Sequence, residues 1–273
     1  MDRENGGPEH GVVGITSFPG RIHMIIAQIS DTHIALDTPD ADRRLADFAR
    51  VIAHINGLDL QPDVIVHTGD IVHNGRPDEY ARAVAILAAA RAPVYVLAGN
   101  KDDRANLRAA FSAVGYLATG AGFIQYAIED FPIRLLVLDT TSTTSNKGDF
   151  CAERARHLSD MIDADRSRPI AVFAHHPPFE VTVGPDRIHF EDMAAFARLR
   201  GALQRSPEII GLFCGHVHRP TTGHVAHIPA TVATSVATTL RKGDYPAEMT
   251  DRPTYLLHRF QADGRVVSET KIA

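Results

Sequence analysis

The chain has 273 residues, of which 44% are hydrophobic and 22% are charged, and its formal net charge is -5. This composition is typical of a globular protein with a large core, and the acidic balance argues against binding to a nucleic-acid polymer or a membrane surface. A small soluble substrate is therefore expected. No segment has the roughly 20 consecutive apolar residues that a membrane-spanning helix needs, which argues against a membrane protein.

The N-terminal segment differs in composition from the rest of the chain. Residues 1–23 are rich in Gly and Pro and lack hydrophobic periodicity, whereas Met24 begins an apolar run. We therefore expect a disordered tail or leader segment over 1–23 and a folded domain over 24–273. The two cysteines, Cys151 and Cys214, are too few for a disulfide framework and favour a reducing compartment, so a cytoplasmic location is predicted.

Short segments rich in β-branched residues alternate with amphipathic segments from residue 24 onward. Strands are predicted at 25–29, 64–67, 94–97, 123–128, 134–138, 170–174 and 209–214, and helices at 43–55, 79–90, 104–114, 153–162 and 193–203. The segments 225–239 and 255–269 are predicted to be β-structure with turns, and no long helix is expected after residue 218. This alternation predicts an α/β protein in which two sheets pack together with helices on the outside.

Five of the predicted strands are followed by a polar cluster. The clusters are Asp31-Thr32-His33, Gly69-Asp70, Gly99-Asn100, His175-His176 and Gly215-His216-Val217-His218. Taken singly, each has a structural explanation, such as a helix cap, a turn or a hydrogen-bonded core histidine. Because ligands bind at the carboxyl ends of strands in α/β sheets, all five clusters can meet in one place. Their combined content of Asp, Asn and His predicts a metal site.

The spacing within these clusters suits two metal ions. Asp31 and His33 lie two positions apart, and His216 and His218 repeat that spacing, so each pair can point toward one ion. The carboxylate of Asp70 has two oxygens and can bridge two ions. Such clusters supply enough ligands for two metals about 3.5 to 4 Å apart, with positions left open for water and substrate.

The ordered motifs DTH, GD, GN, HHPP and GHVH resemble those of the calcineurin-like metallophosphoesterase superfamily. Within it, GDIVHNGRPDEY is similar to class III cyclic-nucleotide phosphodiesterases and bacterial glycerophosphodiesterases. The resemblance implies a metallophosphoesterase domain over 24–273, built as a four-layer αββα sandwich of two mixed β-sheets flanked by helices. It also implies a metal-dependent hydrolase that cleaves cyclic nucleotides or similar small phosphodiesters by attack of a hydroxide bridging two metal ions.

The resemblance also implies a ligand set for two divalent metal ions. It places Asp31, His33 and His218 on the first metal, Asn100, His175 and His216 on the second, and Asp70 between the two. Choosing His175 over its neighbour rests on the family pattern, since adjacent residues on a strand point to opposite sides. His, Asp and Asn ligands suit Fe, Mn, Zn and Co alike, so the metal stays open.

Three further residues are candidates for catalysis. The family usually has a histidine after the asparagine of the GN motif, where this chain has Lys101. The lysine could steady the phosphate or donate a proton to the leaving oxygen, or it could be a solvated residue in an impaired enzyme. His176 is expected next to the ligands or facing the substrate, and His73 is a candidate phosphate or ribose contact.

Several alternatives remain open from the sequence. The same site could serve a phosphomonoesterase or a hydrolase of nucleoside-diphosphate derivatives, and a non-catalytic scaffold with this fold is a third hypothesis. The loop 178–189 and the segment 241–252 are expected to form the pocket walls. His189 is treated as an ordinary surface or core histidine, and a homodimer is possible.

Overall fold

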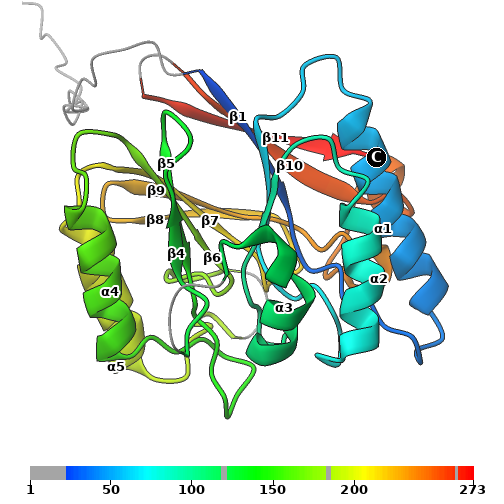
Figure 1. The fold of residues 1–273 in the computed structure, drawn as a ribbon, viewed down its shortest axis with the longest axis horizontal. Helices are drawn as coiled ribbons and strands as arrows, with labels where there is room; N and C mark the ends of the chain where they lie inside the picture. Colours follow the sequence, from blue (N-terminus) through cyan, green and yellow to red (C-terminus); the bar gives the residue numbers. More distant parts are fainter. Residues whose placement is uncertain (1–22, 118–121, 183–185, 262–263) are drawn as a thin grey trace, which may run out of the picture.

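Two β-sheets pack face to face between two layers of helices, as Figure 1 shows. The computed structural model describes residues 23–117, 122–182, 186–261 and 264–273. Helices α1 and α2 cover the outer face of one sheet, and α4 and α5 cover the outer face of the other. The four-layer αββα sandwich predicted from the sequence is confirmed. The predicted tail lies outside the described residues apart from His23.

The first sheet has the strand order β11-β10-β1-β2-β3. Its strands are β1 (Met24–Ile29), β2 (Val64–His67), β3 (Val94–Val96), β10 (Thr254–Phe260) and β11 (Val266–Ile272). The first three are parallel, and β10 pairs antiparallel with β1. Helix α1 (Ala41–Asn56) joins β1 to β2, and α2 (Pro77–Leu87) joins β2 to β3. The carboxyl ends of β1, β2 and β3 therefore lie at the same edge of the sheet.

The second sheet has the strand order β4-β5-β6-β7-β9-β8. Its strands are β4 (Tyr126–Ile128), β5 (Arg134–Leu138), β6 (Ile170–Ala174), β7 (Ile209–Cys214), β8 (Thr221–Val225) and β9 (Ile228–Val232). The strands β5, β6, β7 and β9 are parallel to one another. Helix α4 (Ala152–Asp163) joins β5 to β6, and α5 (Met193–Gln204) joins β6 to β7. The shorter elements are α3 (Arg104–Ala110), η1 (Ser112–Val114), η2 (Thr238–Leu240) and α6 (Ala247–Thr250).

Apolar side chains fill the space between the two sheets and the spaces under the helices. Successive residues of a strand point to opposite faces of its sheet. Phe173 of β6 and Phe213 of β7 stack at 5.1 Å and belong to the same buried cluster as Ile29 of β1. Their neighbour Val172 points the other way, into the cluster that contains Leu158 of α4. This close packing on both faces fixes the strand ends that carry the polar clusters.

Most element boundaries follow the sequence prediction. The strands at 64–67, 134–138, 170–174 and 209–214 have the predicted bounds, and the helices predicted at 43–55, 153–162 and 193–203 lie within α1, α4 and α5. As predicted, only the short η2 and α6 follow residue 218 in the described part of the chain. Among the described residues, no helix is long and apolar enough to cross a membrane.

The helix predicted at 79–90 is observed at Pro77–Leu87, and the strand predicted at 94–97 ends at Val96. Three further differences from the prediction have identifiable reasons. The helix predicted at 104–114 ends at Ala110 and tightens into η1, which stops at Gly115 with a positive φ of 76°. The strand predicted at 123–128 begins only at Tyr126, because the backbone groups of Phe123 and Ile124 bond to side chains instead of a neighbouring strand. The predicted β-structure at 225–239 contains β9, but β8 lies before it, and the two strands form a hairpin that turns at Ala226, a non-glycine residue with φ of 54°.

Candidate metal centre

Backbone hydrogen bonds join the loops that follow the strands of both sheets. The amide of Asp31 donates to the carbonyl of Gly69 at 3.0 Å, and the amide of Gly215 donates to the carbonyl of His175 at 3.0 Å. The amide of His216 donates to the carboxylate of Asp31 at 3.1 to 3.2 Å, which links the first sheet to the second. Four of the five polar clusters, those that follow β1, β2, β6 and β7, therefore meet in one place.

One group of side chains comes from the loops after β1, β2 and β7. One donor atom from each of Asp31, His33, Asp70 and His218 lies within 4.8 Å of the others. The Nε2 of His218 is 3.2 Å from Asp31 Oδ1 and 3.0 Å from the Nε2 of His33. The Nε2 of His33 is in turn 3.4 Å from Asp70 Oδ2. All four side chains are buried, so this group can enclose one cation.

A second group forms around the amide of Asn100. Its Oδ1 lies 3.2 Å from the Nε2 of His175 and 2.9 Å from the Nδ1 of His216. The Nε2 of His175 is 3.5 Å from Asp70 Oδ1. Asp70 therefore lies between the two groups, with Oδ2 toward His33 and Oδ1 toward His175.

Hydrogen bonds to the histidines leave lone pairs pointing into the centre. The Nδ1 of His175 donates to the carbonyl of Thr68 at 2.8 Å, so in the neutral ring the lone pair of Nε2 faces the oxygens of Asp70 and Asn100. Three acceptor atoms that face one another repel unless a proton or a cation lies between them. The Nδ1 of His218 likewise donates to a backbone carbonyl, that of Leu240, at 2.8 Å. This donor set fits metal ions that bind oxygen and nitrogen ligands.

The charge balance of the centre also favours a bound cation. In the described part of the chain, the ion pairs of Asp31 and Asp70 are with histidines, and neither carboxylate pairs with Lys or Arg. Burial raises the pKa of Asp70, but the charge and hydrogen bond of His175 outweigh this effect and hold that pKa below its usual range. Burial lowers the pKa of His175, but Asp70 and Asp31 raise it to about 9. A metal ion bound here would replace that proton.

The sequence model of one protein family, the calcineurin-like phosphoesterases, matches residues 24–220 of the chain. The chain belongs to the calcineurin-like phosphoesterase family. The phosphoesterase is 34% identical to a glycerophosphodiester phosphodiesterase from Enterobacter lignolyticus, with 77% of this chain and 78% of the relative aligned. It is 30% identical to a probable glycerophosphodiester phosphodiesterase from Arcobacter nitrofigilis, over 90% of this chain and 92% of the relative.

Further relatives share the fold or part of the sequence. A cAMP/cGMP dual specificity phosphodiesterase from Mycobacterium tuberculosis is 27% identical over 80% of this chain and 69% of its own length. Among solved structures, a dimetal phosphatase from Danio rerio superposes with a TM-score of 0.67 at 15% identity, over 90% of this chain and 98% of that one. The similarity to the Danio rerio phosphatase concerns the fold alone.

Five of the seven residues expected to hold metal have a left-handed backbone. They are Asp31, His33, Asp70, His216 and His218, with φ between 44° and 73°. This conformation costs a residue with a side chain on the order of 1 to 3 kcal/mol, and it persists where the surrounding structure enforces it. It lets the chain of the phosphoesterase reverse directly after a strand and turn these side chains inward.

Two glycines allow the loops to approach one another. A Cβ at Gly99 would lie 2.3 Å from both the amide nitrogen and Oδ1 of Asp70, and a Cβ at Gly215 would lie 2.2 Å from Ser30 Oγ. Neither approach is possible for a residue with a side chain unless the loops move apart. The glycines of the GN and GHVH motifs are therefore required by the packing of the centre itself.

Lys101 stands at the rim of the centre. Its backbone amide donates to Asp70 Oδ1 at 2.7 Å, and its Nζ donates to Asn146 Oδ1 at 3.4 Å. The next residue, Asp102, secures this turn, because its carboxylate accepts from the amide of Gly99 and from the hydroxyl of Tyr80, both at 2.9 Å. Lys101 is half-buried, so its side chain can reach solvent or a bound substrate.

The two other catalytic candidates have different surroundings. The ring of His73 lies edge-on to His33 at 5.7 Å, next to the first group of side chains. His176 is fully buried, and both of its ring nitrogens bond to protein, Nδ1 to Thr140 Oγ1 at 2.9 Å and Nε2 to the carbonyl of Asn146 at 3.1 Å. His176 therefore offers no free ring nitrogen to a substrate in this arrangement.

Sequence reasoning missed three residues beside the centre. The ring of His189 lies 5.0 Å from that of His216, and the hydroxyl of Tyr245 donates to the carbonyl of His218 at 2.9 Å. Asn146 contacts Asn100 and Lys101. His189 and Tyr245 lie in the segments expected to form the pocket walls, although residues 183–185 are outside the described part. None of the three follows a strand directly, so the pattern of strand ends gave no signal for them.

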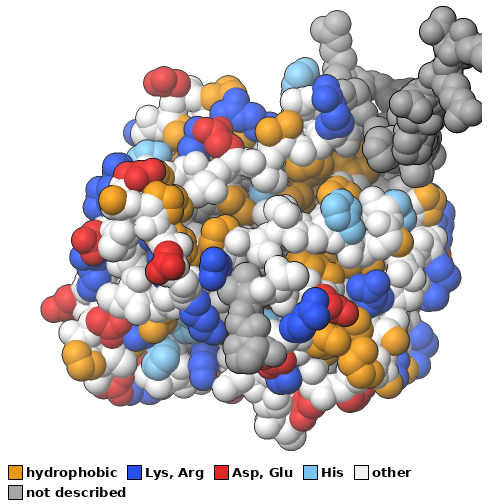
Figure 2. Space-filling view, turned by 180° about the vertical axis from the view of Figure 1, so that it is seen from behind, with side chains coloured by type: hydrophobic (Ala, Val, Ile, Leu, Met, Phe, Trp, Pro, Cys, Tyr) orange, Lys and Arg blue, Asp and Glu red, His pale blue; other side chains and the backbone are white. Residues whose placement is uncertain are grey.

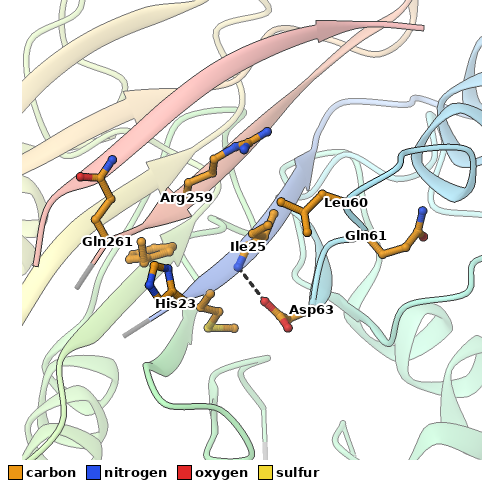
Figure 3. Close-up of a pocket in the computed structure, with 9 residues that line it drawn as sticks. His23, Ile25, Leu60, Gln61, Asp63, Arg259 and Gln261 are labelled. Carbon is orange, nitrogen blue, oxygen red and sulfur yellow. Dashed lines mark hydrogen bonds between the residues drawn. The ribbon is translucent and has the colours of Figure 1, made fainter. Parts of the chain in front are cut away.

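A cavity of about 760 Å³ lies at the opposite end of the first sheet. Figure 3 shows its lining residues at the start of β1, before β2 and at the end of β10, where Asp63 accepts a hydrogen bond from the amide of Ile25. Because β1 runs from this cavity toward the polar clusters, the cavity is separated from the centre by the length of the strand. It contributes no residue to the centre of the phosphoesterase.

Proposed function

We propose that this phosphoesterase hydrolyses small phosphodiesters with the help of two divalent cations held by the residues described above. Asp31, His33 and His218 hold the first cation, Asn100, His175 and His216 hold the second, and Asp70 is shared. The position of Asp70 carries the proposal, because its two oxygens face different groups of donors. Iron, manganese, zinc and cobalt all accept such ligands.

Different side chains are proposed to have different roles around the phosphate. Two bound dications would supply Lewis-acid activation of water and would neutralise phosphate charge. Lys101 can donate a hydrogen bond from Nζ to a phosphate oxygen or a proton to the departing alkoxide, since its side chain stands at the rim. His73, beside His33, is placed to contact a second phosphate oxygen or the sugar.

Charge and similarity support a small substrate over a polymer. The chain has a net charge of -5, and Lys and Arg side chains are interspersed with Asp and Glu side chains on the face shown in Figure 2. A nucleic-acid binder would instead present a basic surface. The relatives named above are glycerophosphodiester and cyclic nucleotide phosphodiesterases, so these two diester classes are the proposed substrates. A cytoplasmic location, in keeping with two free cysteines, and a homodimer remain predictions.

A substrate panel tests the proposal. Metal-stripped protein is reloaded with Mn²⁺ and assayed with cyclic AMP, glycerophosphoethanolamine, bis(p-nitrophenyl) phosphate and p-nitrophenyl phosphate. We expect kcat/KM for at least one diester to exceed that for the monoester. A preference for the monoester would overturn the proposal in favour of a phosphomonoesterase. Two bound Mn²⁺ ions without turnover of any ester would indicate a scaffold instead.

A further inference from the structure

The loop between β5 and α4 is held at its base and along one side. Thr141 and Gly148 pair across its base, and the amide of Asp149 donates to the carbonyl of Thr140 at 2.9 Å. Along the side, the amide of Gly148 donates to the carbonyl of His189 at 2.8 Å, and the amide of Glu191 donates to the carbonyl of Gly148 at 2.7 Å. These bonds place the intervening residues beside the centre.

His176 fixes the backbone of this loop at Asn146. The Nε2 of its ring donates to the carbonyl of Asn146 at 3.1 Å, and the Nδ1 of the ring is hydrogen-bonded to the hydroxyl of Thr140 at 2.9 Å. A Cβ at Gly148 would lie 2.9 Å from the Cβ of His176, so the loop packs closely against this histidine.

The side chain of Asn146 reaches from the loop to the GN motif. Its Oδ1 accepts from the Nδ2 of Asn100 at 3.3 Å and from the Nζ of Lys101 at 3.4 Å. An amide oxygen has two lone pairs and can accept both bonds. Because Asn100 uses its Nδ2 in this contact, its Oδ1 is turned toward His175 and His216.

We propose that Asn146 is a positioning residue that orients the amide of Asn100 and the ammonium of Lys101 for the reaction. The role of Asn146 in orienting Lys101 for catalysis rests on the proposed function. Its role in orienting Asn100 for metal binding rests on the contacts described above. Without Asn146, the amide of Asn100 can flip and present its NH₂ group to the centre, and the ammonium of Lys101 loses its anchor. Partners that orient metal ligands typically contribute 10-fold to 100-fold to metal affinity. In this view His176 acts through Asn146 and does not touch the substrate.

The first test measures metal binding without turnover. Metal-free wild type, Asn146→Ala and Thr143→Ala are titrated with Mn²⁺ by isothermal titration calorimetry, Thr143 being an exposed residue of the same loop. We expect Asn146→Ala to bind one of two Mn²⁺ ions about 10-fold more weakly, and Thr143→Ala to match wild type. An Asn146→Asp variant retains acceptor oxygens and should keep at least the wild-type affinity. Wild-type Mn²⁺ affinity in Asn146→Ala would overturn the assignment, whatever the substrate.

The second test asks whether Asn146 acts through Lys101. At saturating Mn²⁺, Asn146→Ala should lower kcat for cyclic AMP more than it raises KM, and the loss should nearly vanish in a Lys101→Ala background. Effects of residues that act as a unit are not additive. Fully additive losses in the double variant would overturn the link to Lys101. If no variant, including wild type, turns over a diester, the proposed function fails while the Mn²⁺ titration still decides the role of Asn146.

Discussion

The Oδ1 of Asp70 accepts a hydrogen bond of 2.7 Å from the backbone amide of Lys101. This bond ties the residue proposed to be shared by two cations to the turn that carries Asn100. The two groups of side chains therefore depend on one another for their geometry, although they come from different loops. A substitution in one group of side chains should therefore also alter the geometry of the other group.

Asp70→Asn tests the shared carboxylate. The substitution keeps the size of the side chain but removes its charge and one acceptor oxygen, so one cation loses a ligand and the other keeps only a neutral amide oxygen. We expect kcat/KM to fall by more than about 100-fold, since orienting partners alone contribute that much, and metal analysis to find fewer than two ions per chain. Cys151, a half-buried residue that belongs to none of the polar clusters, is the control, and Cys151→Ala should keep full activity. A fully active Asp70→Asn enzyme with two ions would contradict the shared role.

Lys101→Ala separates two roles for the lysine. The ribose oxygen of cyclic AMP is a poor leaving group. If Nζ assists the leaving oxygen, the variant should therefore lower kcat for cyclic AMP by about 10-fold or more beyond any loss of kcat for bis(p-nitrophenyl) phosphate. The comparison of kcat for the two substrates gives the answer. Equal slowing would show that the lysine binds the phosphate and does not assist departure.

Gly99→Ala should disable the centre while the fold persists. The added Cβ would meet the amide and Oδ1 of Asp70 at 2.3 Å, and backbone atoms cannot move aside as a flexible side chain can. We expect loss of Mn²⁺ binding in calorimetry with a far-UV circular dichroism spectrum like that of wild type. Gly201→Ala is the matched control, because its Cβ would meet the end of the Arg205 side chain at 3.4 Å. In helix α5 that change should stabilise by about 0.5 to 1 kcal/mol.

A buried histidine outside the two groups of proposed ligands, His258, should make stability depend on pH. Burial lowers the pKa of His258 from 6.5 to about 3, so between these values the unfolded chain binds a proton that the folded chain does not. Stability from this source is complete above pH 6.5 and is lost as the pH falls. In metal-free protein, the stability gap between wild type and His258→Gln should narrow by about 2 kcal/mol from pH 7 to pH 5, measured by urea unfolding. A constant gap would rule out this origin.

The sequence predicted the fold best where one local signal dominated. Strands β2, β5, β6 and β7 are mainly apolar segments that are almost entirely buried, and their bounds were predicted correctly. Strand β8 was not predicted, because its hairpin with β9 turns at Ala226 without the glycine that usually signals a positive φ. A turn enforced by tertiary contacts leaves little trace in the local sequence.

Some residues of the candidate site could be predicted from the sequence and others could not. Residues directly after strands could be placed together from sequence, because parallel strands bring their carboxyl ends to one edge. Asn146 and His189 could not, since each is positioned by contacts of its loop with the other loop and with His176. Both residues are placed by contacts between segments that lie tens of residues apart in the sequence. Neither hydrophobic periodicity nor residue spacing can predict such contacts.

The left-handed backbone at Asp31, His33, Asp70, His216 and His218 has a consequence for directed evolution. Glycine adopts this conformation without steric cost, so glycine at any of these five positions could make the protein more heat-resistant while deleting a donor atom. A selection that rewards survival at high temperature alone would therefore drift toward inactive variants. Retaining hydrolysis requires that each round also score turnover.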